Sequence, residues 1–290
     1  MATAATMTKT KMSKPGVLKS KIFLGPAGIP AGCKVGSTLD GIRYVHEIGL
    51  DAMEVEFVRG VHMGAAMAKD CGEAAGKLGV KLSVHAPYFI NLSSAEAEKI
   101  TASQKRILDS VERAHEMGAY VVVIHPGHYG KFKQDTVFDM AKEALGEIIE
   151  KMKERRIADV RLGLETTGKH SAFGTLDEIV QLCRQLRQCA PVIDFAHIYA
   201  RNGGKIDYGK IFDTVKPLKL KHLHTHFSNI EFTKAGERMH FVLDSSPAFE
   251  PLAREVLKRK MDITIVSESP VLEQDSLKMK RIFEKLGHKF

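Results

Sequence analysis

The chain has 290 residues, of which 44% are hydrophobic, and it has no apolar run of the roughly 20 residues that cross a bilayer. Its four cysteines show no Cys-x-x-Cys spacing, which argues against a zinc ribbon or disulfide scaffold and favours a reducing compartment. The net charge of +8 is uneven, because the first 21 residues hold five lysines and no acidic residue.

Residues 1–20 are small, rich in threonine and dotted with lysine. They lack the apolar core of a signal peptide and the arginines that are usual in transit peptides. We therefore expect a disordered basic arm, which either only aids solubility or attracts a polyanion such as nucleic acid. The expected compartment is a cytoplasm of the prokaryotic type, and a nucleus fits the same features.

From residue 21 onward, short apolar or β-branched runs alternate with longer amphipathic segments. Residues 95–118 and 136–156 are two such segments, with apolar residues at the helical spacing i, i+3, i+4 and i+7. The predicted strands are the runs 21–25, 52–58, 81–86, 120–126, 161–166, 191–197, 220–227 and 262–269. Eight such units predict a single-domain (β/α)₈ TIM barrel over residues 21–290, with a doubly wound sheet as the alternative.

In a barrel of this kind the active site lies at the C-terminal ends of the strands. Six successive strand ends carry His, Asp or Glu: His85, His125, Glu165, Asp194 with His197, His226 and Glu268. Imidazole nitrogens and carboxylate oxygens are common ligands of transition metals. Carboxylates this close together repel one another unless cations neutralise them, so the series predicts a metal centre. We expect that it involves no membrane and no nucleotide cofactor. The absence of a P-loop and of a G-x-G-x-x-G motif after the first strand supports the last point.

The run "HLHTHF" places three histidines on one side of its strand, because side chains alternate along a strand. His226 is the ligand candidate, since it lies nearest the C-terminal end. His222 and His224 lie deeper and are expected to support the ligands or to fill the core. Asp194 and His197 are three residues apart where the chain turns, so they could face different metals.

The motifs "VHAPYFINL", "VIHPGHYG", "GLETT", "VIDFAH", "HTHFSN" and "VSES" resemble, in this order, the strand-end motifs of the endonuclease IV family. Its members are metal-dependent apurinic/apyrimidinic endonucleases in the xylose isomerase-like TIM-barrel superfamily. The resemblance covers nearly the whole chain from about residue 21. The carboxylate motifs alone fit the sugar isomerases and epimerases of the same superfamily as well.

The resemblance implies a centre of two or three zinc ions, with manganese as an alternative metal. His85 and His125 would hold the first ion, and Glu165 would bridge it to the second. The other ligands of the second ion would be Asp194, His226 and Glu268.

The third metal site departs from the family pattern. His197 would belong to it, and the family usually completes it with an Asp-x-His pair soon after the seventh strand. Here that region reads "KAGERMHFVL", which offers Glu237 and His240 with Met239 between them. Because a thioether is a poor zinc ligand, both two and three metals remain consistent with the sequence. The first loop, "FLGPAGIPAG", also lacks the Gly-x-His motif of the family.

A metal cluster suits phosphodiester hydrolysis, because metal ions lower the pKa of water and stabilise charge on phosphate oxygens. The resemblance implies incision of double-stranded DNA 5′ to an abasic site, leaving a 3′-hydroxyl and a 5′-deoxyribose phosphate, with Glu165 as the catalytic carboxylate. Arg59, Tyr88 and Phe89 follow the second and third strands and are candidates for DNA binding. An aromatic ring beside a cation can stack in the gap left by a missing base. We expect a monomer.

Two alternative functions remain at this point. A sugar isomerase or epimerase on the same barrel would use one or two metals and carboxylate-rich ligands, with little need for three or more histidines. A protein that binds damaged DNA with weakened catalysis would instead be explained by the altered third site.

Overall fold

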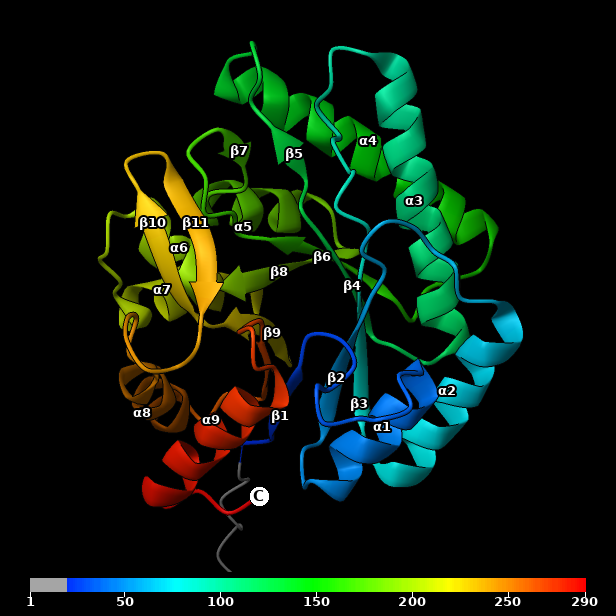
Figure 1. The fold of residues 1–290 in the computed structure, drawn as a ribbon. Coiled ribbons are helices and arrows are strands. Elements are labelled where there is room, and N and C mark those ends of the chain that lie inside the picture. The colour runs from blue at the N-terminus through cyan, green and yellow to red at the C-terminus, as the bar shows by residue number, and fades with distance from the viewer. Residues whose placement is uncertain (1–19) are drawn as a thin grey trace, which may run out of the picture.

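The computed structural model describes residues 20–290. The predicted basic arm, residues 1–20, therefore lies outside the described residues except for its last position. Eight parallel strands form one sheet that curves into a barrel (Figure 1). In chain order they are β1 (Ile22–Pro26), β2 (Ala52–Glu56), β3 (Lys81–His85), β4 (Val121–Ile124), β6 (Arg161–Glu165), β8 (Cys189–Asp194), β9 (Leu223–Phe227) and β12 (Ile263–Ser267). The predicted (β/α)₈ architecture is confirmed.

The barrel is nearly closed between β1 and β2. A single parallel bridge joins Ala27 to Glu54, and the N–H of Gly28 donates to the carbonyl oxygen of Glu54 at 2.8 Å. Gly25 permits this approach, because a Cβ at that position would lie 1.6 Å from the carbonyl oxygen of Ala52. Any side chain at position 25 would hold the two strands apart.

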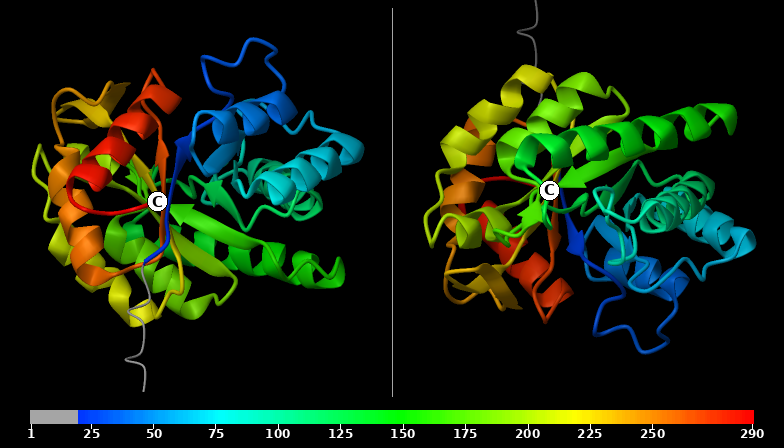
Figure 2. Two further views of the ribbon diagram at one scale, coloured as in Figure 1. Left: turned by 90° about the horizontal axis from the view of Figure 1, so that it is seen from below. Right: turned by 90° about the horizontal axis from the view of Figure 1, so that it is seen from above.

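Helices lie on the outside of the strands (Figure 2). They are α1 (Thr38–Glu47), α2 (Ala65–Leu78), α3 (Ala97–Glu116), α4 (Gln134–Glu154), α5 (Leu176–Gln185), α6 (Phe195–Arg201), α7 (Tyr208–Val215), η1 (Lys216–Leu218), α8 (Phe249–Arg259) and α9 (Glu273–Lys285). In α4 the buried Ala141, Leu145 and Ile148 form one stripe that faces the core. The predicted helical segments 95–118 and 136–156 correspond to α3 and α4. No helix within residues 20–290 is long and apolar enough to span a membrane.

Two short antiparallel pairs are added at the ends of barrel strands. One joins β5 (Gly127–His128), after β4, to β7 (Ala172–Phe173), after β6. The other is a hairpin of β10 (Asn229–Thr233) and β11 (Gly236–Phe241), which follows β9 directly (Figure 1). Both pairs therefore extend the C-terminal end of the barrel, where the candidate site lies.

All eight predicted strand runs overlap an observed strand, but the prediction for 191–197 was wrong in its last three residues. Strand β8 ends at Asp194, whose Oδ1 accepts a hydrogen bond from the N–H of His197 at 2.6 Å. A carboxylate in this position caps a helix, so the chain turns into α6 instead of continuing as a strand.

The large hydrophobic core fills the layer between strands and helices, with Phe195, Phe212 and Phe283 among its fully buried side chains. A separate small apolar cluster is formed by Val121 and Val123 of β4 with Val192 of β8. The rest of the buried strand residues include many polar groups, which are concentrated at the candidate site.

Candidate metal centre

Six neighbouring strands bring the predicted ligands to one end of the barrel. Each strand supplies them at or directly after its C-terminal end, because the parallel ends meet there. Among the described residues, their ligand atoms form groups whose members all lie within 4.8 Å of one another. Three of these groups are His85, His125 and Glu165; Glu165, Asp194, His197 and Glu268; and His197, His240 and Glu268. The fourth contains His226 together with Glu54 and His224.

Glu165 lies at the centre of the cluster and is fully buried. Its Oε2 is 2.7 Å from Nε2 of His125 and 3.3 Å from Nε2 of His85. Its Oε1 is 3.2 Å from Nδ1 of His226 and 3.3 Å from Nδ1 of His197. One buried carboxylate thus contacts imidazoles that come from four other parts of the barrel rim.

Backbone carbonyls orient two of these imidazoles. Nδ1 of His85 lies 2.8 Å from the carbonyl oxygen of Ala86, and Nδ1 of His197 lies 3.0 Å from that of Thr166. A carbonyl oxygen only accepts hydrogen bonds, so we assign the hydrogen of each neutral ring to Nδ1. A metal ion would then bind at Nε2 of each ring, which lies 3.3 Å from Glu165 in His85 and 3.1 Å from Glu237 in His197. Metal-binding histidines are held in this way.

The turn from β8 into α6 brings Asp194 and His197 together. Oδ2 of Asp194 is 3.5 Å from Nδ1 of His197, and it is buried without a hydrogen-bond partner within residues 20–290. His197 is common to the second and third ligand groups. The two side chains therefore face one cluster, in which they can still serve neighbouring ions.

A β-bulge in β11 places Glu237 and His240 on the same face. Residues three apart in a regular strand would face opposite sides. The pairs between β10 and β11 are Ile230–His240, Glu231–Met239 and Phe232–Glu237. Arg238 is therefore an extra residue with no partner in this ladder, and it shifts the alternation by one position.

The bulge allows both predicted side chains of the hairpin to approach the cluster. Oε2 of Glu237 lies 3.1 Å from Nε2 of His197, and Nδ1 of His240 lies 4.0 Å from Oε2 of Glu268. Met239 is 52% exposed and belongs to none of the ligand groups found in the described chain. The methionine that interrupts the family motif therefore does not displace the two ligand candidates.

Opposite charges stabilise one another within the cluster. Burial alone would raise the pKa of Glu165, but attraction by His125 and other imidazoles holds that pKa well below its usual range. Burial alone would lower the pKa of His85, but Glu56 and Glu165 outweigh it and raise that pKa to about 10. Burial raises the pKa of Asp194 well above its usual range. Histidines in the metal-free cluster thus hold protons that metal binding would release.

The donor set fits divalent transition-metal ions. The cluster gathers the side chains of His85, His125, His197, His226, His240, Glu165, Asp194, Glu237 and Glu268. Zinc accepts this mixture of nitrogen and oxygen donors, and manganese and cobalt accept it as well. The buried Oδ2 of Asp194, which lacks a hydrogen-bond partner in the described part of the chain, is an acceptor that a cation would satisfy.

Two carboxylates of β2 belong to the same region and were missed by the sequence analysis. Glu54 is fully buried, 2.9 Å from Nε2 of His226 and 2.8 Å from Nε2 of His224. Glu56 has a buried Oε1 without a partner in residues 20–290, and burial raises its pKa to about 8. The signal was present in "AMEVEFV", where two acids lie two apart in an apolar strand and therefore share one face. His224 lies below His226, as expected.

The predicted DNA-binding side chains lie on loops beside the metal ligands. Tyr88 and Phe89 are 57% and 63% exposed. The ring of Tyr88 lies 6.1 Å from that of His85, measured between centroids. The N–H of Tyr88 donates to the carbonyl oxygen of Val58 at 3.1 Å, which joins this loop to the loop of the exposed Arg59. Two exposed rings and one cation therefore occupy the rim.

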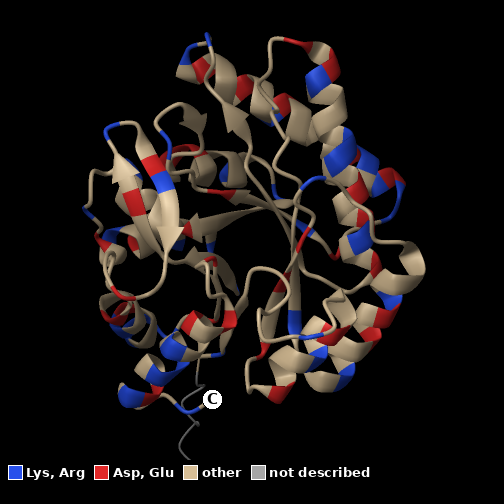
Figure 3. Cartoon of the chain, in the orientation of Figure 1, with Lys and Arg blue, Asp and Glu red and all other residues tan. Residues whose placement is uncertain are grey.

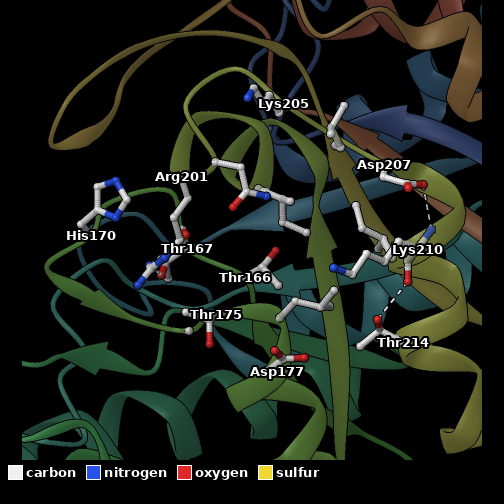
Figure 4. A pocket seen from close by; sticks show the side chains of 16 residues that line it. Thr166, Thr167, His170, Thr175, Asp177, Arg201, Lys205, Asp207, Lys210 and Thr214 are labelled. Atoms are coloured by element: carbon white, nitrogen blue, oxygen red, sulfur yellow. Dashed lines mark hydrogen bonds between the residues drawn. The ribbon is translucent and has the colours of Figure 1, made fainter.

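A cavity of about 700 Å³ adjoins the centre between α5, α6 and α7 (Figure 4). The lining of this cavity includes Thr166, Arg201, Lys205 and Lys210. None of the predicted metal ligands within residues 20–290 lines it. The hydroxyl of Thr166 accepts from the N–H of Asp194 at 2.9 Å. The cavity thus borders the scaffold of the centre and not its ligand atoms.

Comparison with known proteins agrees with this fold. Residues 42–284 match the family described as the xylose isomerase-like TIM barrel. The chain belongs to this family. Within it, the chain is 34% identical over 277 residues to the uncharacterized protein MJ0133 of Methanocaldococcus jannaschii, covering 91% of this chain and 98% of that protein. It is 27% identical over 216 residues to a probable endonuclease 4 of Mycoplasma mobile, covering 70% and 74%. The resemblance to endonuclease IV is confirmed by these relatives.

Solved structures of this barrel type include enzymes of two kinds. Endonuclease IV from Thermus thermophilus matches with a TM-score of 0.66 and 17% identity, covering 91% of this chain and 98% of that chain. A D-tagatose 3-epimerase-like protein matches with a TM-score of 0.70 and 19% identity, covering 91% and 96%. At such identities the likeness establishes the fold alone.

Proposed function

We propose that the protein is a metal-dependent DNA-repair endonuclease that hydrolyses the phosphodiester 5′ to an abasic site. The products would be a 3′-hydroxyl and a 5′-deoxyribose phosphate. The observation that carries this proposal is the set of four imidazoles around the single buried carboxylate of Glu165. A sugar epimerase with one metal has no need of so many histidines. The endonuclease 4 relatives point in the same direction.

Most of the proposed ligands belong to the groups around Glu165 and His197, and His226 and Glu237 join them through their contacts with these two residues. His85 and His125 would hold one ion, and Glu165 would serve both this ion and a second. The remaining ligands are Asp194, His226 and Glu268 for the second ion, and His197, Glu237 and His240 for the third. When bound, the metal ions would lower the pKa of a water molecule and place positive charge beside the phosphate oxygens.

The residues of the chain prepare the site for this reaction. Glu165 stays ionised at neutral pH because its pKa lies well below the usual range. It can therefore accept a hydrogen bond from the attacking water while it holds the two groups together. The carbonyl oxygens of Ala86 and Thr166 keep two histidines in the orientation that ligation requires.

DNA recognition would depend on the rim. An abasic nucleotide leaves a gap in the base stack, and stacking of a base on an aromatic side chain contributes about 1–3 kcal/mol. Tyr88 and Phe89 are exposed and would fill such a gap, and the exposed Arg59 would contact a backbone phosphate. In the view of Figure 3, basic and acidic residues are mixed along α2, α3 and α9. Recognition would thus rest on the rim loops more than on a broad basic surface.

A duplex that carries one tetrahydrofuran abasic analogue tests the proposal directly. With zinc or manganese present, we expect a single incision immediately 5′ to the analogue and none in the matched undamaged duplex. Tight binding without incision would support the damaged-DNA-binding alternative. A metal-loaded protein that neither binds nor cuts the duplex, but epimerises a ketohexose, would show that the sugar-epimerase alternative is correct. Light scattering should give the 32.1 kDa of a monomer.

A further inference from the structure

A chain of buried polar side chains continues from the metal centre into the barrel. Glu54 of β2, Ser83 of β3 and His224 of β9 lie beneath His226, and all four are at most 3% exposed. The series reaches Tyr120, whose hydroxyl lies 2.5 Å from Nδ1 of His224. Neither the proposed reaction nor the ligand groups around Glu165 use these deeper residues.

The contacts of Glu54 determine where the hydrogens of this chain lie. Oε2 of Glu54 accepts from the hydroxyl of Ser83 at 2.7 Å and lies 2.8 Å from Nε2 of His224. A carboxylate only accepts hydrogen bonds, so Nε2 of His224 carries a hydrogen. In the neutral ring Nδ1 then accepts from the hydroxyl of Tyr120. In this series of buried side chains, the hydrogens of Ser83 and His224 point to the carboxylate of Glu54, and the hydrogen of the Tyr120 hydroxyl points to the ring of His224.

The other oxygen of Glu54 faces the metal ligand. Oε1 lies 2.9 Å from Nε2 of His226, and neither atom has a well-aligned hydrogen bond to any group in residues 20–290. On its opposite edge, Nδ1 of His226 is 3.2 Å from Oε1 of Glu165 and 3.2 Å from Oε1 of Glu268. A metal held at Nδ1 requires the hydrogen of the ring to be at Nε2, where Glu54 is the available acceptor.

We propose that Glu54 is a positioning residue for the metal ligand His226. It holds the ring hydrogen at Nε2, so that Nδ1 presents its lone pair to the cluster, and its negative charge strengthens that nitrogen as a donor. The histidines His85 and His197 are oriented by neutral carbonyl oxygens, whereas His226 is supported by an anion. The inference rests on the metal centre of the proposed function, and it does not depend on which bond the enzyme cuts.

The test compares metal affinity in the full-length protein with Glu54 neutralised. Zinc or cobalt is titrated into metal-free protein in competition with a coloured chelator, and Glu54→Gln is expected to weaken the site of His226 about 10- to 100-fold. Asp275→Asn is the matched control, since Asp275 is also fully buried but accepts from the N–H of Leu243. The control should bind metal within about twofold of the wild type.

A second measurement needs no variant and so does not depend on folding of Glu54→Gln. Nitrogen-15 NMR of the zinc-loaded wild type should show the hydrogen of His226 on Nε2 and none on Nδ1. A hydrogen on Nδ1, or wild-type affinity in a folded Glu54→Gln protein, would overturn the proposal. Wild-type protein that binds metal normally but fails to incise abasic DNA would refute the proposed function while leaving this inference standing.

Discussion

Glu165→Gln is the most informative single change, because this residue contacts both halves of the cluster. Glutamine has nearly the same shape but carries no charge, and it replaces one acceptor oxygen by an NH₂ group. That group would face two imidazole nitrogens, either those of His85 and His125 or those of His197 and His226. The substitution therefore removes negative charge and creates a repulsive contact without opening a cavity.

The size of the effect follows from burial. Glu165 is fully buried, so solvent does not screen its contacts. Removal of one partner from a buried charged pair costs about 3–5 kcal/mol. A free energy of about 1.4 kcal/mol corresponds to a tenfold change in an equilibrium constant. The affinity of each metal site that Glu165 serves should therefore fall by a factor of roughly 10²–10⁴. Incision should be lost at metal concentrations that saturate the wild type.

Three measurements check this prediction: zinc titration of metal-free protein, the incision rate on the abasic duplex, and the far-UV circular dichroism spectrum. Glu178→Gln is the control, because Glu178 is a partly buried carboxylate that caps α5 and bonds Tyr129. The control should lose about 1 kcal/mol of stability but bind metal normally. A folded Glu165→Gln protein with wild-type metal content and full incision would show that the role of Glu165 is misassigned.

Three further predictions concern pH, the bulge and the rim. Carboxylates raise the pKa of His85 in the fold from its ordinary value of about 6.5 to about 10, so its contribution to stability is present below pH 6.5 and lost as the pH rises toward 10. The metal-free protein should accordingly become less stable and bind zinc more tightly across this window, and flat urea-unfolding and titration profiles would contradict the assignment. Deletion of Arg238 should make β11 regular and leave Glu237 on the face of His240, because these two residues pair with Phe232 and Ile230, which are two apart, so the metal count per chain should not change. Arg238→Ala loses only an exposed ion pair and should also keep the wild-type count, so a lower metal count in either variant would contradict the assigned register. Tyr88→Ala and Phe89→Ala should each weaken binding to the abasic duplex about 5- to 150-fold, from about 1–3 kcal/mol of stacking, with metal content unchanged; unaltered affinity would exclude stacking.

The gathering of the strand-end histidines and carboxylates could be predicted because it depends on local pattern and one general rule. Each of His85, Glu165 and His226 ends a short apolar run, and the ends of parallel barrel strands meet on one side. The boundary at Asp194 was misjudged because "PVIDFAH" is apolar on both sides of the turn. A hydrogen bond from the side chain to the backbone, which hydropathy does not reveal, ends that strand.

The hairpin illustrates a different limit. Residues three apart, such as Glu237 and His240, face opposite sides of a regular strand, and nothing in "KAGERMHFVL" indicates a bulge. The pairing register with β10 determines where the bulge lies, since Phe232 pairs with Glu237 while Glu231 pairs with Met239. Register depends on packing of the hairpin over the barrel, which is a non-local property.

By itself, the sequence determined the barrel and the end of it at which most of the histidines and carboxylates gather, because alternation along each strand and the parallel arrangement leave little freedom. Only the tertiary structure decided which of those groups touch. Glu54 and His226 lie on β2 and β9, which are far apart along the chain and meet across the barrel interior. A buried carboxylate must find partners wherever the closed barrel supplies them, and no local pattern encodes that choice.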